Sequence, residues 1–131
     1  MSVPGARILL VEDETALIQL LEKYLTRLGY EVEAYPVSKD ALRSFENAPE
    51  RYDLVIADLG MPDIPGDTLL TRMLEIRPEL RILICSGSPF FLASLPKALE
   101  RQVAFLQKPF VPKMLAEAVE QLLRKDNPPG Q

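Results

Sequence analysis

Short apolar segments, each closed by polar or turn-forming residues, alternate along this chain with segments of helical periodicity. The clearest is Leu54–Ala57, which ends at Asp58 and is followed by Gly60 and Pro62. An apolar run of this length between turn formers is typical of a strand buried on both faces of a parallel sheet. The sequence predicts four further strands, of which the second is a weakly alternating edge strand: Arg7–Val11, Glu31–Tyr35, Arg81–Cys85 and Val103–Gln107.

Apolar residues at helical spacing separate these strands. The clearest helix opens at Glu14 or Thr15 and stops at Gly29, a residue type that commonly follows the last helical turn. Ser38 is predicted to act as the N-cap of the next helix, and Gly66-Asp67 leads into a third.

The last helix begins at Pro112 or Lys113. The segment 90–102 is the least regular, because Pro96 interrupts its leucine pattern, so the helix expected there is short or irregular. Strands that alternate with helices predict a doubly wound α/β fold. We expect a five-stranded parallel sheet in the flavodoxin-like order 2-1-3-4-5, with five flanking helices.

Composition excludes several classes of protein. The 131 residues fit one domain, and no apolar run approaches the roughly 20 residues of a membrane span. The start of the chain lacks the pattern of a secretory signal, so a cytoplasmic location is expected. The net charge of −4 offers no footprint for nucleic acid. The expected organisation is a tail at 1–6, one domain at 7–125 and a tail at 126–131.

Two residue types limit the available chemistry. Cys85 is the single cysteine, so no internal disulfide forms, and its apolar surroundings indicate a buried, inert thiol. Histidine is absent, which excludes a Ser-His-Asp triad, a histidine metal site and any phosphohistidine made within this chain.

Polar side chains gather where the predicted strands end. In a parallel sheet these ends share one edge, which brings together Glu12, Asp13, Asp58, Ser86 and Lys108. Taken alone, several of these residues have an ordinary explanation. Asp58 and Ser86 could be turn residues, and Lys108 could be a solvated lysine at the end of a strand. Together, three carboxylates without histidine or cysteine suit Mg²⁺. A lysine and a serine can hold phosphoryl oxygens, and a carboxylate can attack phosphorus.

At these residues the chain resembles the response regulator receiver domain of two-component signalling, of the chemotaxis-regulator type. The resemblance runs from about Arg7 to Arg124. It depends on a set of short motifs in a fixed order: Glu12-Asp13, Asp58 with Met61-Pro62, Gly66, Ser86 and Lys108-Pro109-Phe110.

The resemblance implies that Asp58 accepts phosphate from the phosphohistidine of a histidine kinase or a histidine phosphotransfer protein. Asp13, Asp58 and the backbone carbonyl of Gly60 would bind Mg²⁺, and Glu12 would act through water.

The same resemblance implies that Ser86 and Lys108 contact the phosphoryl group, with Ser86 and Phe105 as switch residues. The Lys108–Pro109 bond is expected to be cis. The switched surface would lie around strands four and five and the segment 90–102. At most slow self-dephosphorylation is expected, not a dedicated enzyme activity.

The chain departs from the family pattern in three places. Gly87 follows Ser86 where many members have alanine, Glu100-Arg101-Gln102 replaces a usual Gly-Ala, and Pro96 falls within the fourth helix. Phe90 and Phe91 are hypothesised to be exposed in the isolated domain and to be covered when a partner binds. A homodimer is left open. Asp63 and Asp67 are assigned to a loop and to helix capping.

Several alternatives stay open at this point. An aspartate phosphatase would carry a second acid two residues after its nucleophile, where this chain has Gly60. A flavin-binding module would need a phosphate-binding loop where the acidic Glu12-Asp13-Glu14 stands. A receiver that is not phosphorylated would serve only as an interaction platform. The chain is expected to be a stand-alone regulator or a receiver cut from a larger protein such as a hybrid sensor kinase.

Overall fold

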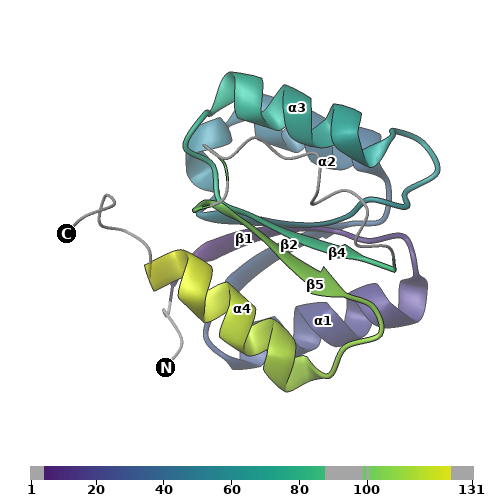
Figure 1. The fold of residues 1–131 in the computed structure, drawn as a ribbon, viewed down its shortest axis with the longest axis vertical. Helices are drawn as coiled ribbons and strands as arrows, with labels where there is room; N and C mark the ends of the chain where they lie inside the picture. Colours follow the sequence, from purple (N-terminus) through teal and green to yellow (C-terminus); the bar gives the residue numbers. More distant parts are fainter. Residues whose placement is uncertain (1–4, 88–98, 100, 125–131) are drawn as a thin grey trace.

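The computed structural model describes residues 5–87, 99 and 101–124. This part of the chain contains a parallel five-stranded sheet in the order β2-β1-β3-β4-β5. Helices α1 and α4 cover one face of the sheet, and α2 and α3 cover the other (Figure 1). The strands are β1 (Arg7–Val11), β2 (Glu31–Tyr35), β3 (Leu54–Asp58), β4 (Ile82–Ser86) and β5 (Val103–Gln107). The helices are α1 (Thr15–Arg27), α2 (Ser38–Asn47), α3 (Gly66–Ile76), α4 (Pro112–Arg124) and the short 3-10 helix η1 (Pro49–Arg51).

The central strand β3 is buried along its whole length, which explains its continuous apolar sequence. Successive side chains of a strand point to opposite faces. Leu54 and Ile56 therefore join the core beneath α1 and α4, while Val55 and Ala57 join the core beneath α2 and α3. Asp58 is the last residue of β3 and lies where the strand leaves the core at the carboxyl-terminal end of the sheet.

The predicted strand order and the parallel sheet are confirmed. Strand β4 begins one residue later than predicted, at Ile82, and Gly29 follows α1 with a positive φ of 103°. Four of the expected five α-helices lie in the described residues. The irregular helix expected within 90–102, with Phe90, Phe91 and Pro96, falls on residues that are mostly outside the described part. None of the described helices combines the length and apolar content that crossing a membrane requires.

The prediction that Ser38 caps α2 is wrong. Val37 occupies the N-cap position and Ser38 is the first helical residue. The Ser38 hydroxyl is fully buried and has no hydrogen-bond partner among the described residues. The first backbone N–H groups of α2 bind instead to the Asp63 carboxylate, which comes from the loop between β3 and α3.

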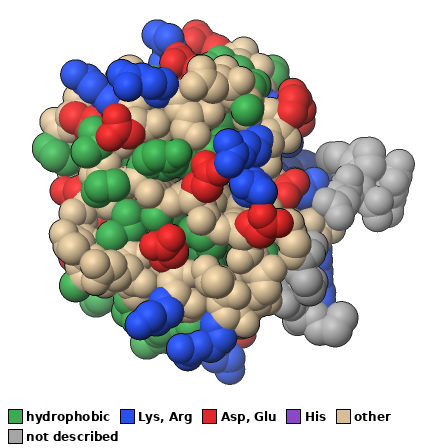
Figure 2. Space-filling model, turned by 180° about the vertical axis from the view of Figure 1, so that it is seen from behind, with side chains coloured by type: hydrophobic (Ala, Val, Ile, Leu, Met, Phe, Trp, Pro, Cys, Tyr) green, Lys and Arg blue, Asp and Glu red, His purple; other side chains and the backbone are tan. Residues whose placement is uncertain are grey.

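The amino-terminal edge of the sheet is held by arginine side chains. Arg77 donates to the carbonyl oxygens of Tyr52 and Pro49, the latter at 2.9 Å. Glu33 pairs with Arg51 and, at 3.3 Å, with Arg7. On the face shown in Figure 2, acidic and basic side chains are interspersed with hydrophobic ones, and neither sign forms a continuous field.

Candidate functional site

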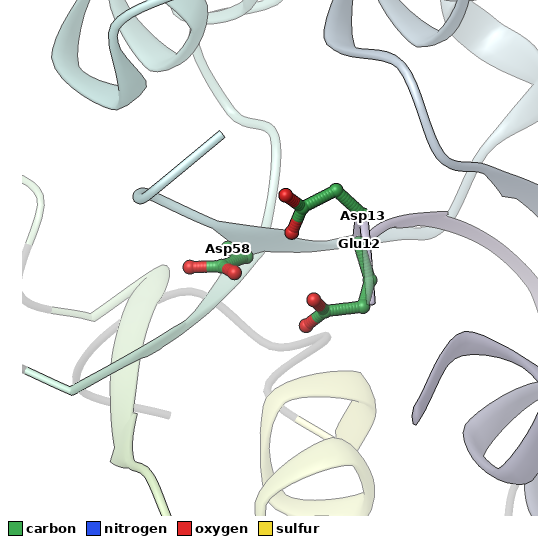
Figure 3. Close-up of side chains that lie close together, drawn as sticks. All are labelled: Glu12, Asp13 and Asp58. Carbon is green, nitrogen blue, oxygen red and sulfur yellow. The ribbon is translucent and has the colours of Figure 1, made fainter. Parts of the chain in front are cut away.

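Three carboxylates meet at the carboxyl-terminal edge of the sheet. Glu12 and Asp13 follow the last residue of β1, and Asp58 is the last residue of the neighbouring β3. Their side chains point toward a common space (Figure 3), and one carboxylate oxygen from each lies within 4.8 Å of those of the other two. Glu12 is 2% exposed and Asp58 is 8% exposed, whereas Asp13 is exposed to solvent. Parallel pairing of β1 with β3 is what brings these distant residues together.

Lys108 comes to the same point from the end of β5. Its Nζ atom lies 2.9 Å from Glu12 Oε1 and 3.0 Å from Asp58 Oδ2, with Glu14 Oε1 further away at 3.6 Å. The residue is fixed there by its backbone, because its N–H donates to the carbonyl oxygen of Ser86 at 2.8 Å. The ammonium group therefore bridges two carboxylates that come from different strands.

Both oxygens of Asp58 have donors. Oδ2 accepts the bond from Lys108, and Oδ1 accepts the backbone N–H of Gly60 at 2.9 Å. Glu12 is held in a comparable way, since its Oε2 accepts the backbone N–H of Glu14 at 3.1 Å. These bonds fix the orientation of the two buried carboxylates.

The charges of the site shift the pKa values of its groups. Burial lowers the pKa of Lys108, but the hydrogen bonds to Glu12 and Asp58 outweigh it and hold that pKa above its ordinary value. Lys108 is therefore charged at neutral pH. Burial raises the pKa of Glu12, an effect that the bond from Lys108 opposes. Burial also raises the pKa of Cys85 to about 12, so its thiol is protonated and unreactive, as its apolar surroundings in the sequence indicate.

The remaining predicted site residues lie around this cluster. Asp58 of β3 pairs with Cys85 of β4, and Ser86 is the next and last residue of β4. Phe105 is half-buried on β5 and packs against the core beneath α2 and α3. The Lys108–Pro109 peptide bond is cis, as the family resemblance implies.

The loop that follows Asp58 returns closely on itself. A Cβ atom at Gly66 would lie 2.7 Å from the Cα and 2.5 Å from the Cδ2 of Leu59. Real Cβ atoms essentially never approach a backbone atom that closely, so only glycine allows α3 to start against the beginning of the loop. Met61, between these residues, is buried in the core beneath α2 and α3.

The donor set of the site fits a magnesium ion. The clustered ligand atoms are all carboxylate oxygens, which is the donor type that Mg²⁺ prefers. Three carboxylate side chains gather around one ammonium group, so acidic groups exceed basic groups by two in this cluster. A divalent cation has the charge that balances this excess.

Sequence reasoning missed two features of the site. It did not pair Lys108 directly with Glu12, and it did not connect Asp63 with α2. Both contacts join residues that are far apart in the chain, so no local spacing indicates them. The absence of a capping side chain at Val37 was the one local signal that a cap had to come from elsewhere.

Comparison with known proteins agrees with this geometry. Residues 8–120 match the family model described as the response regulator receiver domain. The chain is 35% identical over 126 residues to the DNA-binding transcriptional regulator NtrC of Azospirillum brasilense. It is 30% identical over 117 residues to the response regulator receiver protein CpdR of Brucella abortus. The crystal structure of the receiver domain from the hybrid histidine kinase CckA superimposes with a TM-score of 0.76 and 36% identity, over 90% of this chain and 99% of that one.

A parallel sheet with acidic residues and a lysine at its carboxyl edge defines a phosphoryl-accepting signalling module. The chain belongs to the response regulator receiver domain family of two-component systems. The matched region covers 96% of this chain but only 26% of NtrC, and 89% of this chain with 96% of CpdR. This chain therefore spans about a quarter of the first relative and nearly all of the second.

Proposed function

We propose that Asp58 is the phosphoacceptor of this receiver domain. The observation that supports it most is the geometry of the Asp58 carboxylate, which is buried at the sheet edge with one oxygen 3.0 Å from the Lys108 ammonium. That ammonium can stabilise the negative charge of a phosphoryl group. The expected donor is a phosphohistidine on a histidine kinase or a histidine phosphotransfer protein, since the chain has no histidine of its own.

In the transfer, an Asp58 oxygen forms a bond to phosphorus while the bond between phosphorus and the donor's nitrogen breaks. The product is an acyl phosphate on Asp58. The Lys108 ammonium pairs with the phosphoryl oxygens, and the Ser86 hydroxyl donates a hydrogen bond to one of them. The Gly60 N–H holds the carboxylate in place for the attack.

Asp13, Asp58 and the backbone carbonyl of Gly60 would hold Mg²⁺, with Glu12 acting through water. When bound, the ion neutralises charge that develops on the phosphoryl oxygens. The indirect role of Glu12 is the one that the family resemblance implies, and in this structure its two oxygens accept hydrogen bonds from Lys108 and the Glu14 N–H.

The switch that follows phosphorylation would involve Ser86 and Phe105. Phe105 is half-buried at the strand next to Ser86, so inward rotation of its ring would alter the surface around β4 and β5. A dedicated enzyme activity is not part of the proposal, and only slow self-dephosphorylation is expected.

Incubation with acetyl phosphate and MgCl₂ tests the proposal. The wild-type protein should gain one phosphoryl mass, with acetate as the leaving group, and Asp58→Asn should gain none. Asp53→Asn is a matched control, because Asp53 lies at the opposite edge of the sheet, where it accepts the Arg7 N–H. An unmodified wild-type protein would favour the interaction-only receiver, and equal modification of Asp58→Asn would show that another residue is the acceptor.

A receiver within a larger sensor kinase is a second candidate. The likeness to the CckA receiver supports it, and the match with almost the whole of CpdR supports a stand-alone regulator. Both proposals assign the same chemistry to Asp58. Sequencing the genomic region that encodes the chain distinguishes them by the length of the reading frame.

A further inference from the structure

One exposed side chain of the loop between Asp58 and Gly66 forms hydrogen bonds to α2, which covers the same face of the sheet as α3. Asp63 Oδ2 accepts the backbone N–H of Lys39 at 2.8 Å, and Asp63 Oδ1 accepts that of Ser38 at 3.2 Å. These donors are the first two residues of α2. The carboxylate thus connects the acceptor loop with a helix 25 residues earlier in the chain.

The amino end of α2 needs this contact, because its own N-cap residue cannot supply it. Val37 is extended, with φ −126° and ψ 125°, and no side-chain hydrogen bond caps the helix from that position. The first N–H groups of a helix lack partners within it, and a carboxylate also interacts favourably with the helix dipole. Burial acts to raise the pKa of Asp63, but the N–H groups of Lys39 and Ser38 outweigh it and lower that pKa.

The same contact restrains the acceptor site. Asp63 is three residues from Gly60, whose N–H holds Asp58 Oδ1 and whose carbonyl is assigned to Mg²⁺. Gly66 is packed against Leu59 at the far end of the loop. The bonds of Asp63 therefore add a polar attachment to α2 in the middle of a loop that is also held by the buried Met61 side chain. A site held in its reactive geometry loses less order when its ligand binds.

We propose that Asp63 is a positioning residue of the phosphoacceptor site, which holds the Gly60 segment in its metal-binding geometry by attaching the loop to α2. This inference rests on the proposed role of Asp58. It assigns to one carboxylate two separable effects, the stability of α2 and the order of the acceptor loop.

A second variant separates the two effects. Asp63→Ala removes the cap and the attachment together. Val37→Asn supplies a local cap, since residue 37 is 38% exposed and already has the backbone conformation of an N-cap residue. The double variant therefore restores the capping of α2 without restoring the attachment of the loop.

The matched control is Asp67→Ala. Asp67 is an exposed aspartate in the first turn of α3 whose carboxylate accepts the adjacent N–H of Thr68 at 2.8 Å. Its carboxylate forms a comparable local hydrogen bond and, among the described residues, none to α2. Its loss should lower stability slightly and leave the acceptor site unchanged.

The experiment measures three quantities on the full chain: the urea midpoint, Mg²⁺ affinity by titration calorimetry and the rate of phosphorylation by acetyl phosphate. In the double variant the urea midpoint should return to the wild-type value. Mg²⁺ affinity and the phosphorylation rate should each stay about fivefold below wild type, the fold-change that corresponds to the net strength of one of the two hydrogen bonds lost with Asp63.

Wild-type affinity and rate in the double variant, or in Asp63→Ala alone, would overturn the inference and leave Asp63 as a helix cap only. The Asp58 proposal is judged separately, because it fails only if the wild-type protein is not phosphorylated at Asp58.

Discussion

The Tyr52 hydroxyl is buried near the amino-terminal edge of the sheet and lies between two polar side chains. It donates to Glu33 Oε2 and lies 2.5 Å from the Ser44 hydroxyl, while its ring stacks on Phe45. Burial and the bond to Glu33 raise the pKa of Tyr52 above its ordinary value of 10.0. The Tyr52 hydroxyl therefore stabilises the fold as a hydrogen-bond donor, and it does so only while it is protonated.

Tyr52→Phe should lower the free energy of unfolding by about 2 kcal/mol at neutral pH, because a bond to a charged acceptor is lost. A raised folded-state pKa contributes stability that is complete below the unfolded pKa and is lost as pH rises through the folded pKa. The difference between wild type and Tyr52→Phe should therefore be constant up to about pH 10 and shrink above it.

Urea unfolding between pH 7 and pH 11 measures this difference. Tyr24→Phe, which removes a tyrosine hydroxyl from α1 on the other face of the sheet, is measured in parallel as the matched substitution. A difference that grew with pH would contradict the assignment of Tyr52 as the donor.

Ser38→Ala is expected to stabilise the protein. The Ser38 hydroxyl is fully buried without a hydrogen-bond partner among the described residues, and an unsatisfied buried polar group costs about 1–3 kcal/mol. The backbone N–H that binds Asp63 stays in the variant. The urea midpoint should rise at an unchanged slope.

Ser44→Ala is the opposing control for this substitution. Its hydroxyl bonds to Tyr52, so its removal should lower the midpoint. A lower midpoint for Ser38→Ala as well would show that the Ser38 hydroxyl has a partner, such as a buried water.

Among the secondary-structure elements, the connection from β3 to α3 is the one most constrained by close packing. Gly66→Ala would place a methyl group within 2.7 Å of the Leu59 Cα, and a backbone atom cannot move aside as a flexible side chain does. We expect a loss of about 1–3 kcal/mol in stability and a slower reaction with acetyl phosphate, since the loop carrying Gly60 must shift.

Gly87→Ala is the matched control, because a Cβ atom there meets nothing within 4 Å. Its stability should stay level or rise by about 0.5 kcal/mol through the less flexible unfolded chain. Thermal unfolding and the phosphorylation rate compare the two variants. Equal effects of the two substitutions would contradict the packing argument.

At the level of elements, sequence patterns were informative where packing is regular. The apolar run of β3 predicted a buried central strand because both of its faces are covered. Parallel pairing then placed Asp13, Asp58 and Lys108 at one edge without any further information. The pattern failed at Ser38, since the carboxylate that caps α2 comes from a loop 25 residues later.

At the scale of the whole molecule, the proposed Mg²⁺ site at the acidic edge predicts that folding stability depends on divalent cations. Ligands that bind only the native state stabilise it by mass action. At a free Mg²⁺ concentration ten times the dissociation constant, the gain is about 1.4 kcal/mol, or a rise of about 4 °C in Tm for a domain of this size.

Calorimetric melting in MgCl₂ and in NaCl of equal ionic strength measures this gain. Asp13→Asn should abolish the Mg²⁺-dependent rise, because it removes an exposed carboxylate of the cluster. Asp67→Asn should retain it. An equal rise in NaCl would indicate general screening of charge and contradict a specific ion site.

The arginines at the amino-terminal edge of the sheet have a consequence for how the domain can be joined to others. Arg81 donates to the carbonyl oxygen of Leu123, which places the last turn of α4 near the start of β4. The chain therefore enters β1 and leaves α4 on the side away from Asp58. A segment fused at either boundary would therefore be joined at the end of the domain opposite the acceptor.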